Sequence, residues 1–186
     1  MSAFSTNPLL VDWKANYGIP PFHDIKPEHY EPAFDSAVNS HFEELKQIAS
    51  HEAPATFENT IIAFDRSGDL MDKISGVFHN LCSSNGIPEL QAVERKLAGP
   101  FAAYRLKIYA FPGLFSRIDS IYESRHSLSL SREDIRLVER FHLDFVRAGA
   151  RFDAEKQAKY SEIVKELANL STQFNQVTTI LFAIMD

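Results

Sequence analysis

Apolar residues recur every three or four positions along most of this 186-residue chain. One such series runs through Tyr30, Phe34, Val38, Leu45 and Ile48. This spacing places apolar side chains on one face of an α-helix, whereas a half-buried strand alternates at every second residue. The pattern therefore predicts an all-α fold, an antiparallel stack of about six helices.

Glycine and proline separate the periodic stretches, and capping residues precede several of them. Thr56, Ser131 and Asp153 are suitable N-caps, because their side-chain oxygens accept hydrogen bonds from the free amides of a first helical turn. We expect helices at about 27–48, 56–81, 88–108, 112–122, 131–148 and from 153 toward the C-terminus.

Two residues interrupt the expected helices. Gly68 is predicted to bend or break the second helix. Pro100 removes one backbone hydrogen bond from the third helix and predicts a kink near 96–100.

The first 26 residues carry turn-forming rather than periodic sequence, including Pro8, Gly18, Pro20 and Pro21. We expect residues 1–26 to form an extended N-terminal strap, pinned to the helices by apolar side chains such as Leu9 and Trp13. Residues 27–186 are then one helical domain, since a chain of this length buries one substantial core.

Charge and composition argue against several classes of partner. Lys and Arg number 19 against 25 Asp and Glu, and no basic run could neutralise a row of phosphates, so no nucleic acid is expected. The most apolar run, residues 177–185, is too short to span a bilayer, so no membrane partner is expected. Cys82 is the single cysteine and the first residues do not resemble a signal peptide, which favours a cytoplasmic location.

Two short motifs resemble zinc-protease signatures without completing them. His51 and Glu52 begin a His-Glu-x-x-His pattern, but Ala55 stands where the second histidine is required, and Pro54 disfavours the helix that would present the pair. The inverted pattern starting at His41 likewise lacks its second histidine. We predict no catalytic, cofactor-binding or metal-ligating residue in this chain.

One pair stays open as a minor alternative. Glu139 and His142 are three residues apart on an expected helix, so an unrelated helical bundle could use them as a catalytic or ligand pair. A surface pair or a buried, hydrogen-bonded histidine is the preferred interpretation. Cys82 has no adjacent base in the sequence and is interpreted as a small core residue.

Longer stretches carry a more specific signal. They are "NPLLVDW", "PPFHDIKPEHYEPAF", "EAPATFENTI", "LQAVERKLAGPFAAYR" and "RFHLDFVRAGARF". In this order they resemble the N-terminal part of the thimet oligopeptidase, oligopeptidase A and peptidyl-dipeptidase family of zinc metallopeptidases, over about residues 7–176. The run "HLDFVRAGAR" favours the peptidyl-dipeptidase (dipeptidyl carboxypeptidase) branch.

The resemblance implies a longer, two-lobed helical hydrolase around a channel that admits short peptides and releases C-terminal dipeptides. It also implies a catalytic zinc on a His-Glu-x-x-His helix far downstream, with a further Glu as ligand. None of those residues exists in this chain. The present segment would supply part of one lobe, as scaffold and channel wall, and would be inactive by itself.

The likeness ends near the C-terminus. Relatives continue with a polar helical stretch, whereas residues 177–186 read "VTTILFAIMD". Apolar helix faces left exposed are expected to drive homo-oligomer formation. The alternative function is a free-standing, non-catalytic helical protein that binds peptides or a partner.

Overall fold

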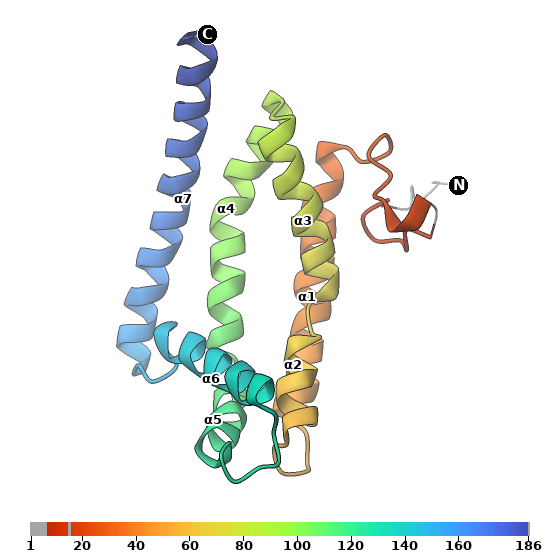
Figure 1. Cartoon of the computed structure of the whole chain (residues 1–186). Helices are drawn as coiled ribbons and strands as arrows, with labels where there is room; N and C mark the ends of the chain where they lie inside the picture. The colour runs from red at the N-terminus through yellow and green to blue at the C-terminus, as the bar shows by residue number, and fades with distance from the viewer. Residues whose placement is uncertain (1–6, 15, 186) are drawn as a thin grey trace, which may run out of the picture. The chain divides into compact units, whose positions relative to one another are not determined.

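The computed structural model of the chain describes residues 7–14 and 16–185 (Figure 1). The side chains of residues 16, 154 and 179–185 lie outside this description. The segment 177–186, where the sequence is expected to depart from the family, therefore falls mostly outside the described side chains. Within the described ranges every regular element is helical, which confirms the predicted all-α class. The long helices are α1 Tyr30–Ala49, α3 Asp69–Ser84, α4 Pro88–Tyr109, α5 Leu114–Ser124, α6 Arg132–Arg147 and α7 Ala154–Met185.

Four short elements complete the list. Two are 3-10 helices, at Asn16–Gly18 and Pro27–His29. A π-helix spans Phe57–Ile62 and leads directly into the three-residue helix α2, Ala63–Asp65. None of the helices in the described ranges combines the length and apolar character that a membrane crossing requires.

The predicted N-caps are confirmed. Thr56 Oγ1 accepts from the backbone N–H of Asn59 at 3.1 Å, and Ser131 Oγ accepts from that of Asp134 at 3.1 Å. Asp153 Oδ1 accepts from the backbone N–H three residues on, at 2.9 Å. These bonds satisfy amides that have no partner inside the helix, so each helix start is fixed by its own sequence.

Gly68 breaks the second expected helix rather than bending it. It has φ +84°, a left-handed conformation that favours glycine, and α3 begins at the next residue. A Cβ atom at this position would lie 3.0 Å from ring atoms of the buried His41. Glycine is therefore favoured here both by the left-handed backbone conformation and by the small space beside the imidazole.

The start of α5 differs from the prediction. The helix begins at Leu114, not Pro112, because Gly113 has φ +82° and ends the preceding turn. Pro100 lies inside α4 as expected, and the kink near it stays a prediction.

The chain divides into two compact units, and helices α1, α4 and α7 contribute residues to both. The first unit comprises residues 1–41, 68–99 and 169–186; the second comprises 42–67 and 100–168. Each is described by itself below. The boundary expected between residues 26 and 27 stays a prediction.

In the first unit, α1 and α3 lie side by side in opposite directions (Figure 1), with the rings of Tyr30 and Phe78 4.8 Å apart. The N-terminal segment packs on this unit through the fully buried Leu9. The side chain of Asn7 also anchors this segment, because its Nδ2 donates to the backbone carbonyl of His29 at 2.8 Å.

In the second unit, one buried apolar cluster joins the end of α1, the π-helix, α5 and α6. Its members are Leu45, Ile48, Phe57, Ile61, Leu114, Ile118, Ile121, Val138 and Phe145. These side chains come from stretches far apart in the sequence, so burial of the shared cluster fixes how the helices of this unit meet.

Candidate functional site

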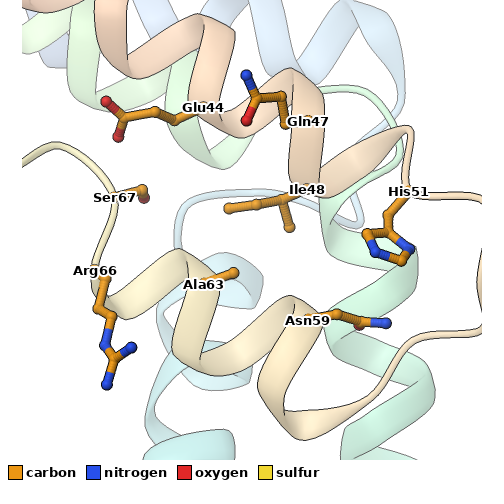
Figure 2. Close-up of a pocket in the computed structure, with 8 residues that line it drawn as sticks. All are labelled: Glu44, Gln47, Ile48, His51, Asn59, Ala63, Arg66 and Ser67. Carbon is orange, nitrogen blue, oxygen red and sulfur yellow. The ribbon is translucent and has the colours of Figure 1, made fainter.

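A hollow of about 420 Å³ opens in the second unit between the end of α1 and the segment containing the π-helix and α2 (Figure 2). Figure 2 shows Ile48 and Ala63 between the two segments, Glu44 and Gln47 on the α1 side, and Arg66 extending away from α1. His51, Asn59 and Ser67 complete the lining. The lining combines one acid, one guanidinium and neutral polar groups with the apolar side chains of Ile48 and Ala63, so both polar and apolar contacts are available to a ligand.

Arg117 of α5 fixes the loop beside this hollow. Its Nη1 donates to the carbonyls of His51 at 3.0 Å and Ala53 at 3.2 Å. Its Nη2 donates to Asn59 Oδ1 at 3.0 Å, and its Nε donates to Thr60 Oγ1 at 3.2 Å. One guanidinium therefore connects α5, the loop and the π-helix through charge-assisted hydrogen bonds.

The same contacts show how the incomplete His51-Glu52 motif is arranged in the structure. His51 and Glu52 lie exposed in this loop, not on a helix, and the carbonyl of His51 is bound by Arg117. The His41 motif is also not an open ligand set, since the His41 side chain is buried against Gly68.

A second polar cluster surrounds His142 of α6. Its Nε2 lies 2.9 Å from Asp119 Oδ1 of α5, and its ring stacks on that of Tyr122 with centroids 3.7 Å apart and planes 5° apart. The guanidinium carbon of Arg125 lies over the Tyr122 ring, 3.9 Å from the ring centroid. His142 is 8% exposed, so its main contacts are with protein.

Glu139 and His142 are not a pair in this structure. Glu139 instead lies 3.5 Å from Arg125 and 3.6 Å from Arg136. Of the two preferred interpretations, a surface pair or a buried and hydrogen-bonded histidine, the structure agrees with the second for His142. Sequence reasoning missed its actual partner, Asp119, because that residue is 23 positions away on another helix.

Among the residues that the structure describes, no side-chain group fits a zinc site. In the described part of the chain, no three His, Cys, Asp or Glu side chains converge as a metal-binding group. Burial raises the pKa of the Cys82 thiol to about 12, with a further contribution from the nearby charge of Glu94. A thiol with this pKa stays protonated at neutral pH and is a poor nucleophile or ligand.

Comparison with known proteins gives a consistent set of relatives. The chain is 38% identical over 172 residues to the dipeptidyl carboxypeptidase of Salmonella typhimurium, covering 92% of the chain and 25% of that protein. It is 36% identical over 170 residues to the dipeptidyl carboxypeptidase of Escherichia coli, covering 91% and 25%. Oligopeptidase A of Escherichia coli is 28% identical over 170 residues, covering 91% and 24%.

No protein-family profile matches the chain. The chain spans about a quarter of the length of the curated relatives it matches. The order of identities also agrees with the "HLDFVRAGAR" run, which favours the dipeptidyl carboxypeptidase branch. By these similarities, the chain is related to the N-terminal region of the family of dipeptidyl carboxypeptidases and oligopeptidase A.

Proposed function

We propose that this chain is the N-terminal scaffold and channel-wall region of a zinc metallopeptidase of the peptidyl-dipeptidase type. The observation that carries the proposal is the 38% identity over 92% of the chain, set against only 25% of the relative's length. In this proposal, hydrolysis of short peptides and release of C-terminal dipeptides belong to a longer enzyme. The chain alone is inactive.

The available metal-ligand side chains support a scaffold role for this chain and a catalytic role for another part of the enzyme. A catalytic zinc lowers the pKa of a bound water to about 7 and polarises the scissile carbonyl. The described residues offer no three converging ligands for such an ion, and Cys82 is held protonated. In this proposal the described residues supply structure, and the reacting groups belong to the rest of the longer enzyme.

Local rigidity supports a scaffold role. Arg117 fastens the loop at 51–53 to α5, and the Asp119–His142 contact joins α5 to α6. A wall of this kind can bound a peptide channel because its side chains are held by helix-to-helix contacts. In this proposal, the hollow in Figure 2, which has both polar and apolar lining residues, is a surface that touches the peptide.

A chimera tests the proposal. The matching 170 residues of the Escherichia coli dipeptidyl carboxypeptidase are replaced by residues 7–176 of this chain, and release of C-terminal dipeptides from a blocked tetrapeptide is measured. We expect chelator-sensitive release by the chimera and none by the isolated chain with added zinc. Helical, monodisperse chimera without activity would contradict the scaffold role, as would chelator-sensitive turnover by the isolated chain.

A second candidate function is that of a free-standing, non-catalytic helical protein that binds a peptide or protein partner. It is favoured by one observation: the described part of α7 exposes Ile163, Leu167, Leu170, Phe174 and Val177. We accordingly propose that the isolated chain self-associates through exposed helix faces. Its single cysteine is compatible with the cytoplasm as its location.

A further inference from the structure

A small hollow of about 100 Å³ lies in the first unit, beside the junction of the N-terminal segment and α1. Its lining comes from residues 22–27 of that segment, the start of α1, the end of α3 and the start of α4, which meet at one end of the unit (Figure 1). Every described lining residue belongs to the first unit, so the hollow is formed within that unit alone. We call it the strap hollow, after the N-terminal strap.

Tyr30 brings an unpartnered polar group to the lining of the strap hollow. Its side chain is 1% exposed, and its hydroxyl is buried with no hydrogen-bond partner among the described residues. A buried hydroxyl without a partner costs free energy, so such groups in native proteins usually bond to protein, water or a ligand. Burial, with a smaller contribution from Cys82, raises the pKa of Tyr30 to about 12. The hydroxyl is therefore protonated at neutral pH and can donate a hydrogen bond.

Two further hydrogen-bond donors line the strap hollow. Lys26 and Asn85 are exposed, and neither the ammonium nor the side-chain amide makes an ion pair or hydrogen bond with another described residue. The described lining contains no Asp or Glu, and the Asp24 carboxylate, two residues before Lys26, lies 3.2 Å from His23 Nε2. A phenol O–H, an amide N–H and an ammonium can all donate to one anionic oxygen group. The polar part of the lining therefore suits an anion.

The size and the remaining walls of the strap hollow restrict which anion fits. The other six described lining residues are apolar: Phe22, Ile25, Pro27, Leu81, Ile87 and Leu90. Since an apolar cavity of about 150 Å³ holds benzene, this hollow accommodates a group of roughly four or five non-hydrogen atoms. Inorganic phosphate would leave the apolar walls without a partner, whereas an alkyl chain that ends in a carboxylate matches both parts of the lining.

We propose that the strap hollow binds a short aliphatic carboxylate. The Tyr30 hydroxyl and the Asn85 amide donate to the carboxylate oxygens, the Lys26 ammonium balances the charge, and the alkyl part contacts the apolar walls. A free alkanoate and the C-terminus of a peptide both present this chemistry, and the experiment below distinguishes them. The proposal concerns the first unit alone and does not depend on the peptidase assignment.

A bound carboxylate would join segments that are far apart in the sequence. Lys26 belongs to the N-terminal segment, Tyr30 begins α1, and Asn85 directly follows α3. A ligand that binds only the folded arrangement of these segments stabilises the native state. We therefore expect the melting temperature of the chain to rise with the concentration of the carboxylate.

Titration of the ¹⁵N-labelled full chain with propanoate, followed by amide chemical shifts, tests the site. We expect saturable shifts centred on residues 22–30 and 81–90, with a dissociation constant on the order of 1–10 mM for a ligand with so few atoms. Propanamide is the matched neutral ligand, because it has the same size and lacks the charge. It should bind at least about 10-fold more weakly and leave the melting temperature unchanged.

Two variants assign the donors. Tyr30→Phe keeps the ring and removes the buried hydroxyl, so it should weaken propanoate binding about 10-fold or more. Lys26→Met removes an exposed charge and should weaken binding by a smaller factor, about 3-fold. Lys107→Met is the matched control, since Lys107 is an exposed lysine of α4 in the second unit and its loss should leave binding unchanged.

Three results would overturn the proposal. They are no saturable shifts up to about 50 mM propanoate, equal binding of propanamide, and unchanged affinity in a Tyr30→Phe variant that keeps the circular dichroism of the wild type. The source of the carboxylate is decided by the dipeptide acetyl-Ala-Ala and its C-terminal amide. Tighter binding of the peptide acid than of propanoate supports a peptide C-terminus, and equal or weaker binding supports a free alkanoate. Equal binding of the peptide acid and its amide would contradict recognition of a carboxylate.

Discussion

Asp119 and His142 belong to different helices, and their side chains meet at 2.9 Å in the second unit. Asp119 also lies 3.4 Å from Arg151, so one carboxylate contacts both an imidazole and a guanidinium. The ring of His142 is covered by Tyr122 on one side. This cluster joins α5 to α6 by polar contacts beside the apolar core.

Asp119→Ala should destabilise the protein by about 1–3 kcal/mol, because it leaves the largely buried His142 Nε2 without its partner. Urea denaturation monitored by circular dichroism measures the effect. Asp144→Ala is the matched control, since Asp144 pairs with an exposed Arg140 on the same helix and should cost about 0.5 kcal/mol or less. Equal losses for both variants would contradict the structural importance of the Asp119–His142 contact.

Arg117→Lys should loosen the conformation of the loop at 51–53, although the positive charge is kept. A lysine cannot reproduce four hydrogen bonds made in several directions by one planar guanidinium. We expect faster limited proteolysis within residues 50–56 and a loss of about 1–3 kcal/mol in unfolding free energy. Arg132→Lys, at an exposed position of α6, should change neither, and a protected loop in Arg117→Lys would refute the prediction.

Two alanine substitutions for glycine should act in opposite directions. Gly68→Ala should cost more than about 1 kcal/mol, because it forces a Cβ into a left-handed residue and to within 3.0 Å of the His41 ring. Gly76→Ala should stabilise by about 0.4–1 kcal/mol, because it lies inside α3 with no atom near the new Cβ. Thermal and urea unfolding of the pair measure both signs, and a stabilising Gly68→Ala would show that the break is not strained.

Tyr30 should make the protein sensitive to alkaline pH. Burial raises the pKa of its hydroxyl from 10.0 to about 12, so the unfolded state loses the proton first as pH rises. The contribution of the protonated Tyr30 to the free energy of unfolding is therefore fully present below pH 10 and is lost as pH rises toward about 12. Urea denaturation between pH 8 and pH 11 should show this fall, and Tyr30→Phe should reduce its slope.

The same substitution has a second readout at neutral pH. The Tyr30 hydroxyl is buried and has no hydrogen-bond partner among the described residues, so Tyr30→Phe removes an unsatisfied group while keeping the ring contact with Phe78. We expect no loss of stability at pH 7, or a gain of up to about 1 kcal/mol. A loss of more than about 1 kcal/mol in the free energy of unfolding would instead show that the hydroxyl has a hydrogen-bond partner.

The sequence by itself determined the helical class, the approximate helix boundaries and the N-caps at Thr56, Ser131 and Asp153. These features depend on residues three or four positions apart, whose interactions form within a single turn. Gly68 was also readable as an interruption. The close approach of the His41 ring, which leaves little room for a Cβ at Gly68, comes from a residue 27 positions earlier in the chain and was not readable from local sequence.

Only the tertiary structure decided which polar side chains meet. Asp119 contacts His142 across 23 positions, Arg117 contacts Thr60 across 57, and Arg95 contacts Gln176 across 81. Periodicity shows which face of a helix is apolar, but it does not show which other helix covers that face. In α7 the periodic residues Leu170, Phe174 and Val177 are exposed, while Gln176 is buried by its hydrogen bonds to α4, an arrangement that the apolar pattern does not predict.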